Sequence, residues 1–353
     1  MNKIKMKCAC WFGPRKIELI DRPKPKLKSG EVLIQVESVG VCGSDIHYYL
    51  EGKIGDQIIK PPLILGHEFS GIVRETKDTE HKHLIGKRVA VEPGIACGKC
   101  EFCRTGHYNV CLNMQFLGGP GCDGALVEYM AVPADHCFIV PKTMSAPLAS
   151  MIEPAAVALH AVELASVHPG ETALLVGLGP IGLLTAQILL NSGVSFLAGI
   201  DLISHRTTVA QKLGVHWTFV PNLENCVDES VNWIQQLTEK RGFDITFDCT
   251  NRSEGLMIAC YGTRPAGRSV LIGISGKDYD SIPVCVARRR ELNLQWCRRF
   301  RYNFPATIKL IEQGKINLEP LLTHHFSPEQ TQKAFDTVAN TENNVIKASI
   351  DWV

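Results

Sequence analysis

Four cysteines lie in one short stretch of the chain with the spacing C-x2-C-x2-C-x7-C: Cys97, Cys100, Cys103 and Cys111. A loop of this kind can bring four thiolates around one tetrahedral zinc ion, which also favours the thiolate form at neutral pH. The alternative is a pair of disulfides or a redox loop. It is disfavoured because 353 residues should form a core without such staples and because cytosolic thiols stay reduced. Four thiolates leave no open position for a substrate, so we expect this zinc to be structural.

The composition is that of a globular chain with two domains. Hydrophobic residues make up 45% of the 353 residues, which supports substantial cores. The 37 basic and 36 acidic residues give a net charge of +1, so we expect no nucleic-acid partner. The sequence has neither a signal-like segment nor an apolar run approaching about 18 residues, which favours a cytoplasmic protein that does not bind a membrane. The 14 cysteines favour a reducing compartment with metal sites.

The hydrophobic pattern changes near Pro154. Before it, short β-rich runs such as 32–36, 69–73 and 127–132 predict an antiparallel, barrel-like β domain with long loops. After it, apolar strands alternate with helical segments, which predicts an α/β domain with a doubly wound parallel sheet. These strands are expected at 172–176, 196–200, 217–220, 245–249 and 270–274, with a helix at 181–190. The expected domains are a catalytic β domain over 1–154, a dinucleotide-binding domain over 155–288, and a segment over 289–353 that returns to the first domain.

A glycine motif, Gly177-Leu-Gly179-Pro-Ile-Gly182, follows a predicted strand and opens a predicted helix. In a dinucleotide site the first glycine permits the tight turn, the second lets the backbone approach the pyrophosphate, and the third packs helix against strand. The N–H groups at the helix start then face the phosphates. Asp201, at the end of the next strand, can accept hydrogen bonds from both hydroxyls of the adenosine ribose. A glycine turn without a ligand is the alternative, and Asp201 in a βαβ frame argues against it.

The cations His205 and Arg206 leave two cofactors to consider. Either side chain could bind the 2′-phosphate of NADP, whereas Arg206 could instead stack against adenine. A 2′-phosphate beside the Asp201 carboxylate would be repelled, because like charges interact strongly in a low dielectric. NAD is therefore the expected cofactor.

Further candidate metal ligands are scattered through the first domain: Cys42, His67, Glu68 and Glu153. Taken singly, they have ordinary explanations, such as a thiol that fills the core, a hydrogen-bonded loop histidine and a carboxylate at a helix start. Spacing alone does not join them into one site.

The order of the motifs along the chain, in contrast, indicates that these candidate ligands belong to one site. The chain resembles the zinc-dependent medium-chain dehydrogenases over roughly residues 5 to 350, and within that family it is most similar to the sorbitol (polyol) dehydrogenase branch. The family motifs are Cys42-Gly-Ser-Asp-x-His47, Gly66-His-Glu68, the four-cysteine loop, Glu153-Pro154 and Gly177-x-Gly-x-x-Gly182. The branch segments are His47-Tyr48-Tyr49, Gly52-Lys-Ile-Gly55, Lys60-Pro-Pro-Leu-Ile-Leu-Gly-His67, Glu153-Pro-Ala-Ala-Val-Ala-Leu-His160 and Phe300-Arg301-Tyr302. The resemblance implies a GroES-like β-barrel catalytic domain followed by a Rossmann domain.

The resemblance also implies two zinc ions per chain. Cys42, His67 and Glu68 would bind the catalytic zinc, with Glu153 acting through or beside a zinc-bound water, and the four-cysteine loop would bind the structural zinc. Alcohol dehydrogenases of the family usually have a cysteine in place of Glu153, and many animal sorbitol dehydrogenases lack the four cysteines. Zinc would act on a substrate hydroxyl as a Lewis acid while NAD accepts the hydride. The proton would leave through Ser44, water and His47.

For His47 the alternative is a surface loop histidine, since a proton relay can run through water alone. The implied substrate contacts are Tyr48, Glu153, Arg301 and Tyr302, where a solvated basic turn is the alternative for the arginine segment. The implied cofactor contacts are Gly177, Gly179, Ile181, Gly182, Asp201, Arg206, Ile272, Gly273, Ile274, Arg299, Phe300 and Arg301. The chain departs from the branch at Trp296-Cys297-Arg298-Arg299, which leaves the fine substrate specificity open.

The sequence therefore predicts an NAD-dependent zinc oxidoreductase, similar to L-iditol 2-dehydrogenases, that interconverts a sorbitol- or xylitol-like polyol and its ketose. One alternative is a dehydrogenase of another secondary alcohol, such as a sugar acid or an amino-alcohol. A second is a catalytically silent binding protein on the same fold, which should have lost a zinc ligand or the glycine turn, and both are intact. The expected partner is a small-molecule substrate, and the resemblance implies a homotetramer.

Overall fold

The computed structural model describes residues 5–353, which divide into two compact units. The first unit comprises the described residues up to Glu153 together with Phe304–Glu312 and Leu321–Val353. The second unit comprises Pro154–Asn303 and Gln313–Pro320. Within the described part of the chain, every helix is too short or too polar to cross a membrane.

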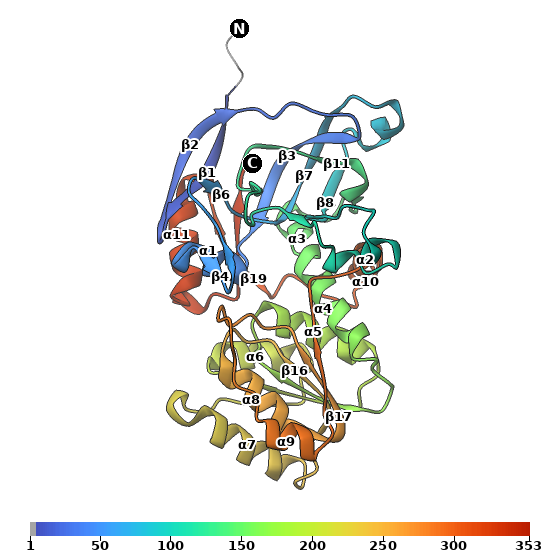
Figure 1. Ribbon diagram of the computed structural model, residues 1–353, viewed down its shortest axis with the longest axis vertical. Helices are drawn as coiled ribbons and strands as arrows, with labels where there is room; N and C mark the ends of the chain where they lie inside the picture. The colour runs from blue at the N-terminus through green and yellow to red at the C-terminus, as the bar shows by residue number, and fades with distance from the viewer. Residues whose placement is uncertain (1–4) are drawn as a thin grey trace. The chain divides into compact units, whose positions relative to one another are not determined.

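A largely antiparallel sheet organises the first unit, with the strand order β12-β8-β7-β3-β20-β19 and with β11 paired to β3 (Figure 1). Strand β3 (Glu31–Gly40) is central, and its valine-rich run is buried at most positions, as a strand with neighbours on both sides requires. β3 pairs with β7 (Glu68–Thr76) from Val32↔Thr76 to Gly40↔Glu68. The other strands are β1 (Lys5–Gly13), β2 (Lys16–Pro23), β4 (Lys53–Ile54), β5 (Gln57–Ile58), β6 (Leu63–Ile64), β8 (Arg88–Val91), β9 (Gly94–Ile95), β10 (Gln115–Phe116), β11 (Tyr129–Pro133), β12 (Cys137–Ile139), β19 (Leu322–Phe326) and β20 (Lys347–Asp351).

Short helices connect these strands. Helix α1 begins directly after Cys42, whose side chain belongs to a capping box completed by Asp45, and it ends at a left-handed Gly52. Helix α4 crosses the boundary between the two units. The helices of the first unit are α1 (Gly43–Glu51), α2 (Glu101–Arg104), α3 (Ala146–Ser150), α10 (Phe304–Glu312) and α11 (Thr331–Ala339), and α4 spans Ile152–Leu164.

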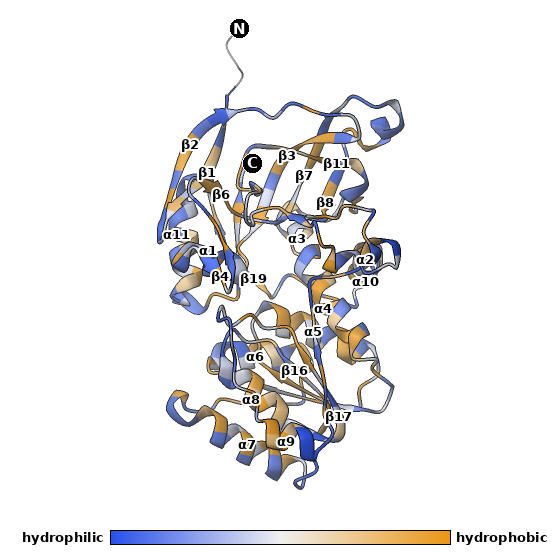
Figure 2. Cartoon of the chain, in the orientation of Figure 1, coloured by the Kyte–Doolittle hydropathy of each residue, from blue (hydrophilic) through white to orange (hydrophobic). Residues whose placement is uncertain are grey.

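A parallel sheet with the order β15-β14-β13-β16-β17-β18 forms the second unit. Its central strands β13 and β16 are buried, as expected for a sheet covered by helices on both faces, and orange, hydrophobic segments run through this unit in Figure 2. The strands are β13 (Thr172–Val176), β14 (Phe196–Ile200), β15 (Trp217–Phe219), β16 (Phe243–Asp248), β17 (Thr263–Leu271) and β18 (Asn293–Trp296). The helices are α5 (Pro180–Asn191), α6 (Ser204–Lys212), α7 (Cys226–Leu237), α8 (Ser253–Gly262) and α9 (Val284–Arg289). The predicted α/β class with a doubly wound sheet is confirmed.

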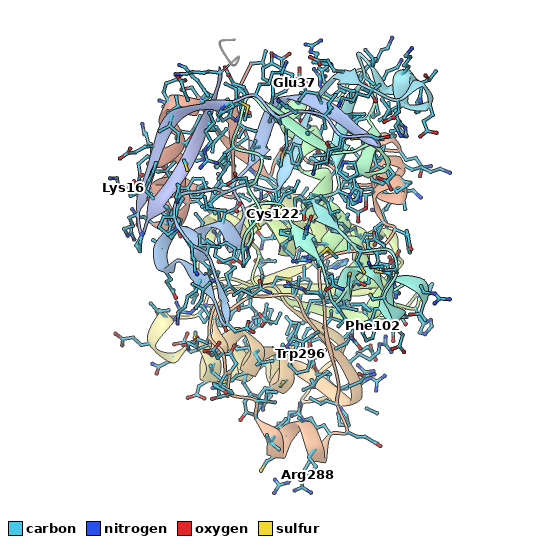
Figure 3. All side chains as sticks on the ribbon, turned by 45° about the horizontal axis from the view of Figure 1, so that its top comes forward. Lys16, Glu37, Phe102, Cys122, Arg288 and Trp296 are labelled. Carbon is cyan, nitrogen blue, oxygen red and sulfur yellow. The ribbon has the colours of Figure 1, made fainter. Side chains whose placement is uncertain are left out.

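The predicted domain boundary at residue 288 is too early. Strand β18 pairs in parallel with β17 from Arg268↔Asn293 to Leu271↔Trp296, so the second unit continues to Asn303. The chain enters the first unit at Phe304, and Gln313–Pro320 belongs to the second unit again. The sequence did not predict β18, because an edge strand with exposed residues such as Trp296 (Figure 3) has only a weak hydrophobic pattern.

Candidate metal centres and dinucleotide site

The four-cysteine loop folds so that its thiols meet. The Sγ atoms of Cys97, Cys100, Cys103 and Cys111 all lie within 4.8 Å of one another. The Sγ of Cys100 is 3.5 Å from that of Cys103 and 3.9 Å from that of Cys111. A tetrahedral zinc with four Zn–S bonds needs S···S separations of about 3.8 Å, so the spacing suits this metal. The described cysteines form no disulfide, which removes the support for a disulfide pair.

Backbone N–H groups favour the thiolate form of Cys97, whereas Cys103 favours the thiol. The N–H groups of Lys99 and Cys100, followed by the Cys111 thiol, lower the pKa of Cys97 to about 6. Desolvation and then the neighbouring thiols of Cys100 and Cys111 raise the pKa of Cys103 to about 12. The cluster alone therefore favours only partial ionisation, because four adjacent thiolates would repel one another. A cation at their centre would allow all four to ionise.

The second group of possible ligands is assembled from separate elements. Cys42 precedes α1, His67 directly precedes β7 and Glu68 begins β7, and their ligand atoms lie within 4.8 Å of one another. His67 is 4% exposed and Glu68 is 1% exposed. A thiolate, an imidazole and a carboxylate suit zinc and leave a fourth tetrahedral position for water or a substrate. The structure thus brings together three of the four expected ligands.

Glu153 is the fourth expected ligand, and it is not in this group of mutually close donors. Its side chain is buried, it lies in the first turn of α4, and its charge acts on Lys347, which contacts Glu68. The geometry therefore does not favour direct binding of Glu153 to the same metal. It fits a Glu153 carboxylate that lies beside the three ligands and acts through a water molecule.

Asp45 orients His67. The Asp45 carboxylate accepts from the N–H groups of Cys42 and Gly66, and its Oδ1 is 3.3 Å from Nδ1 of His67. Burial acts to lower the pKa of His67, but the charges of Asp45 and Cys42 raise it well above its usual value. With Nδ1–H directed to Asp45, Nε2 is left for a metal, which is the usual arrangement of a metal-bound histidine.

Lys347 forms a buried ion pair with Glu68 through its Nζ atom. Burial acts to lower the pKa of Lys347, but the charges of Glu68, Cys42 and Glu153 outweigh it and raise the pKa above its usual value. The lysine comes from β20 and reaches β7 across Gly40 of β3, where a Cβ atom would collide with the Glu68 carboxylate. The missing side chain at Gly40 therefore makes room for this ion pair.

Helix α1 carries the candidate relay and substrate residues, and Ser44 among them contacts Cys42. The Ser44 hydroxyl donates to the Cys42 sulfur over 3.3 Å, and His47 is three residues further along the same helix. Tyr48 is buried, and its hydroxyl donates to Oε1 of Gln57 over 3.3 Å. The hydroxyl oxygens of Ser44 and Tyr48 keep acceptor capacity for a ligand.

The glycine motif of the second unit has the expected form. Gly177 has φ 91°, and a Cβ there would lie 2.9 Å from the Thr250 side chain, while a Cβ at Gly182 would collide with the carbonyl oxygen of Gly177. At Gly179 the nearest atom to a Cβ would be Nη1 of Arg206 at 3.7 Å, so the backbone there is open to a ligand. A cradle of this shape at the start of α5 fits a dinucleotide pyrophosphate.

Asp201 directly follows β14 and is buried, and its carboxylate accepts hydrogen bonds from the backbone of its own chain. Its Oδ2 accepts from the Leu178 N–H over 2.7 Å and its Oδ1 from the Ile203 N–H over 2.9 Å. Arg206 places Nη1 3.7 Å from Oδ2 of Asp201. Each carboxylate oxygen can accept a second hydrogen bond, so ribose hydroxyls can still bind.

The remaining predicted residues of the second unit lie in two segments. Ile272, Gly273 and Ile274 follow β17, where a Cβ on Gly273 would collide with the Thr250 carbonyl. In the other segment Phe300 is buried, Arg301 is partly exposed and Tyr302 is 67% exposed. Both segments follow carboxyl ends of strands, the edge at which open α/β sheets bind ligands.

Sequence reasoning missed Lys347, the role of Asp45, and the ion pair of Arg206 with Asp201. Asp45 could have been found, since it stands three residues after Cys42 at a helix start, where a carboxylate completes a capping box. Lys347 gave no local signal, because it is 279 positions from Glu68 and meets it only through the sheet.

Comparison with known proteins finds matches to both parts of the chain. Residues 28–142 match the family model described as the alcohol dehydrogenase GroES-like domain, and residues 180–313 match the one described as zinc-binding dehydrogenase. Sorbitol dehydrogenase of Bacillus subtilis is 32% identical over 345 residues, covering 98% of this chain and 97% of that protein. L-idonate 5-dehydrogenase of Vitis vinifera is 33% identical over 343 residues, covering 96% of this chain and 93% of the relative.

Solved structures agree as well. The crystal structure of an alcohol dehydrogenase from Escherichia coli CFT073, complexed with the cofactor NADH, superposes with a TM-score of 0.88. The two chains are 28% identical, and the match covers 99% of each. The relative binds a nicotinamide cofactor on a fold that this chain shares over nearly its full length.

Proposed function

Because the chain belongs to the sorbitol dehydrogenase branch of the zinc-dependent medium-chain dehydrogenases, we propose that it interconverts a polyol and its ketose with NAD. The observation that carries the proposal is the group of Cys42, His67 and Glu68, in which His67 and Glu68 are buried, with the buried Glu153 outside this set of mutually close donors. Zinc bound by this group would supply Lewis-acid chemistry to one substrate hydroxyl. A second zinc on the four-cysteine loop would be structural.

The proton of the substrate hydroxyl would leave along α1. Ser44 lies against the Cys42 sulfur, so its hydroxyl is next to the metal ligands. His47 is three residues further along α1, about one helical turn away, and would take the proton from Ser44 or from a water between them. Glu153, as a buried acceptor, would orient the reacting hydroxyl or a water.

A polyol suits the polar residues that we assign to the substrate. Glu153, Tyr48, Arg301 and Tyr302 offer acceptors and donors for several hydroxyls, and the planar arginine fork can bind two oxygens at once. A simple alcohol would leave these groups unpaired. Sites built to bond hydroxyls reject analogues that lack them by factors on the order of 10⁴ in favourable cases.

NAD is the proposed cofactor because Asp201 is buried and negatively charged where the ribose would lie. The Asp201 carboxylate can accept from both ribose hydroxyls but would repel a 2′-phosphate. Arg206 is partly neutralised by its ion pair with Asp201, so it attracts a phosphate less than an isolated arginine would.

A sugar acid is the second candidate substrate. Arg298, Arg299 and Arg301 bring three guanidinium groups into one short segment, and a carboxylate is the group they would pair with best. One relative is named for L-idonate. Hydride transfer from a secondary hydroxyl of the sugar acid to NAD would be the same reaction as for a polyol.

The test is a panel of sorbitol, xylitol, L-idonate, 2-propanol and ethanol, each with NAD and with NADP, measured by absorbance of the reduced cofactor. We expect kcat/KM for the best polyol with NAD to exceed that for 2-propanol by at least about 100-fold. Equal efficiency on 2-propanol and on the best polyol would contradict the polyol assignment. Preference for L-idonate would select the sugar acid, and no turnover of any substrate would select the binding-protein alternative.

A further inference from the structure

The segment that carries Arg301 has a strained backbone. Arg299 and Tyr302, which are not glycines, have φ values of 56° each. A left-handed conformation is unfavourable for a residue with a side chain, so such a segment keeps its shape only where its surroundings impose it. The buried ring of Phe300 anchors one side of the segment.

Asn303 supplies the contact on the other side. It is 2% exposed, and its Oδ1 accepts from the Arg301 N–H over 2.6 Å. Its Nδ2 donates to Oε2 of Glu163 over 2.8 Å. The amide side chain therefore joins the backbone of Arg301 to the last turn of α4.

Glu163 determines which way this amide faces. Burial acts to raise the pKa of Glu163, but His160, Asn303 and Arg301 together hold it below its usual value, so the carboxylate is ionised at neutral pH. A carboxylate only accepts hydrogen bonds, so the Nδ2 group of Asn303 must face it and Oδ1 must face Arg301. A carboxylate near a helix C-terminus is disfavoured by the helix dipole, so these partners compensate for its position.

We propose that Glu163 and Asn303 form a clamp that positions Arg301 for a hydroxyl-rich substrate, which makes them specificity-determining positioning residues. The ring of the buried His160 supports the clamp, with Nδ1 3.8 Å from Oε2 of Glu163. This inference rests on the proposed role of Arg301 in substrate binding. The clamp acts through the Arg301 backbone and touches neither substrate nor cofactor.

The test compares Asn303→Ala, Glu163→Gln, Arg301→Ala and the double variant Asn303→Ala/Arg301→Ala. The full chain is assayed with the best polyol and with 2-propanol, both at saturating NAD. Asn222→Ala is the matched control, because Asn222 bonds Glu229 through the same amide–carboxylate contact elsewhere in the second unit. Glu163→Gln keeps the inference testable if Asn303→Ala fails to fold, since Glu163 is half exposed.

Asn303→Ala should raise the polyol KM about tenfold or more, because Arg301 is no longer held in place for the substrate, while 2-propanol kcat/KM changes less than about twofold. Glu163→Gln should shift the same ratio in the same direction by a smaller factor, and Asn222→Ala should shift nothing. Asn303→Ala should add nothing on top of Arg301→Ala, because both act on one group.

Equal losses on both substrates, or additive losses in the double variant, would overturn the clamp and leave Asn303 as an ordinary structural residue. If Arg301→Ala alone affected both substrates equally, the role of Arg301 would fail first and the clamp with it. The single Arg301 variant therefore separates failure of the proposed function from failure of the clamp.

Discussion

The two candidate metal groups of the first unit differ in how the chain builds them. The four-cysteine group comes from one loop, residues 97–111, whereas the group of Cys42, His67 and Glu68 is completed by Lys347 from the far end of the chain. The loop group consists of four thiols, which lie against one another and accept hydrogen bonds from backbone N–H groups such as those of Cys97 and Asn113. The group at β7 is supplied with its own cation, Lys347, and with an orienting carboxylate, Asp45.

This difference predicts different relations between metal and folding. Four adjacent thiolates need a cation to coexist, so the loop group should order fully only with zinc. The ion pair of Lys347 and Glu68 neutralises a buried carboxylate without a metal. The second group should therefore keep its shape while metal, water and substrate exchange at it, which is what an open catalytic centre requires.

Removing Lys347 should have the largest effect on stability. In Lys347→Met the buried Glu68 carboxylate loses its cation, and breaking a buried pair in this way costs about 3–5 kcal/mol. Because bound zinc would partly replace the lost charge, the loss should be larger in metal-free than in zinc-loaded protein. Urea unfolding with and without a chelator measures both values.

Lys347→Arg is the control, since it keeps a charge at the same position. It should lose less stability than Lys347→Met in the metal-free state. Equal destabilisation by Lys347→Met with and without zinc would show that the lysine does not act through Glu68.

Cys100→Ser should affect stability rather than the reaction, because it removes one ligand of the structural group. Loss of one thiolate weakens the loop zinc, so we expect Tm to fall by at least about 5 °C, while kcat of the surviving protein changes less than about threefold. Calorimetry, zinc content and kcat are measured on the same preparation. A large fall in kcat with unchanged Tm would assign the loop group to the chemistry instead.

Asp201→Ala should have a smaller effect, on cofactor choice. The variant loses ribose hydrogen bonds and the repulsion of a 2′-phosphate, so the NAD KM should rise about tenfold and the preference over NADP should narrow. Arg206→Ala added to Asp201→Ala should reverse any gain with NADP. Wild-type protein that already used both cofactors equally would refute this role for Asp201.

Local signals predicted much of this molecule. The strand Thr172–Val176, the turn at Gly177 and the helix after it were found because each follows from neighbouring residues. The four cysteines form the cluster that their spacing indicated. Cys42, His67 and Glu68 could be joined only through resemblance, because no periodicity links a helix start to a strand start.

Contacts between distant parts of the chain could not be predicted. The space at Gly40 that admits Lys347 depends on which strands are neighbours, and so does the burial of Glu68. The bond from Asn303 to Glu163 spans 140 positions and needs the backbone turn at Tyr302. The edge strand β18 was missed because exposed residues interrupt its apolar pattern.

The contrast between the two metal groups is tested most directly by timed removal of metal. The purified chain is incubated with a chelator, and zinc content, activity and Tm are followed in the same samples. We expect two zinc ions per chain at the start, rapid loss of one together with all activity and with little change in Tm, and slow loss of the second with a fall in Tm. A single zinc at the start, or activity that persists after the first zinc has left, would contradict the assignment of one open catalytic centre and one closed structural centre.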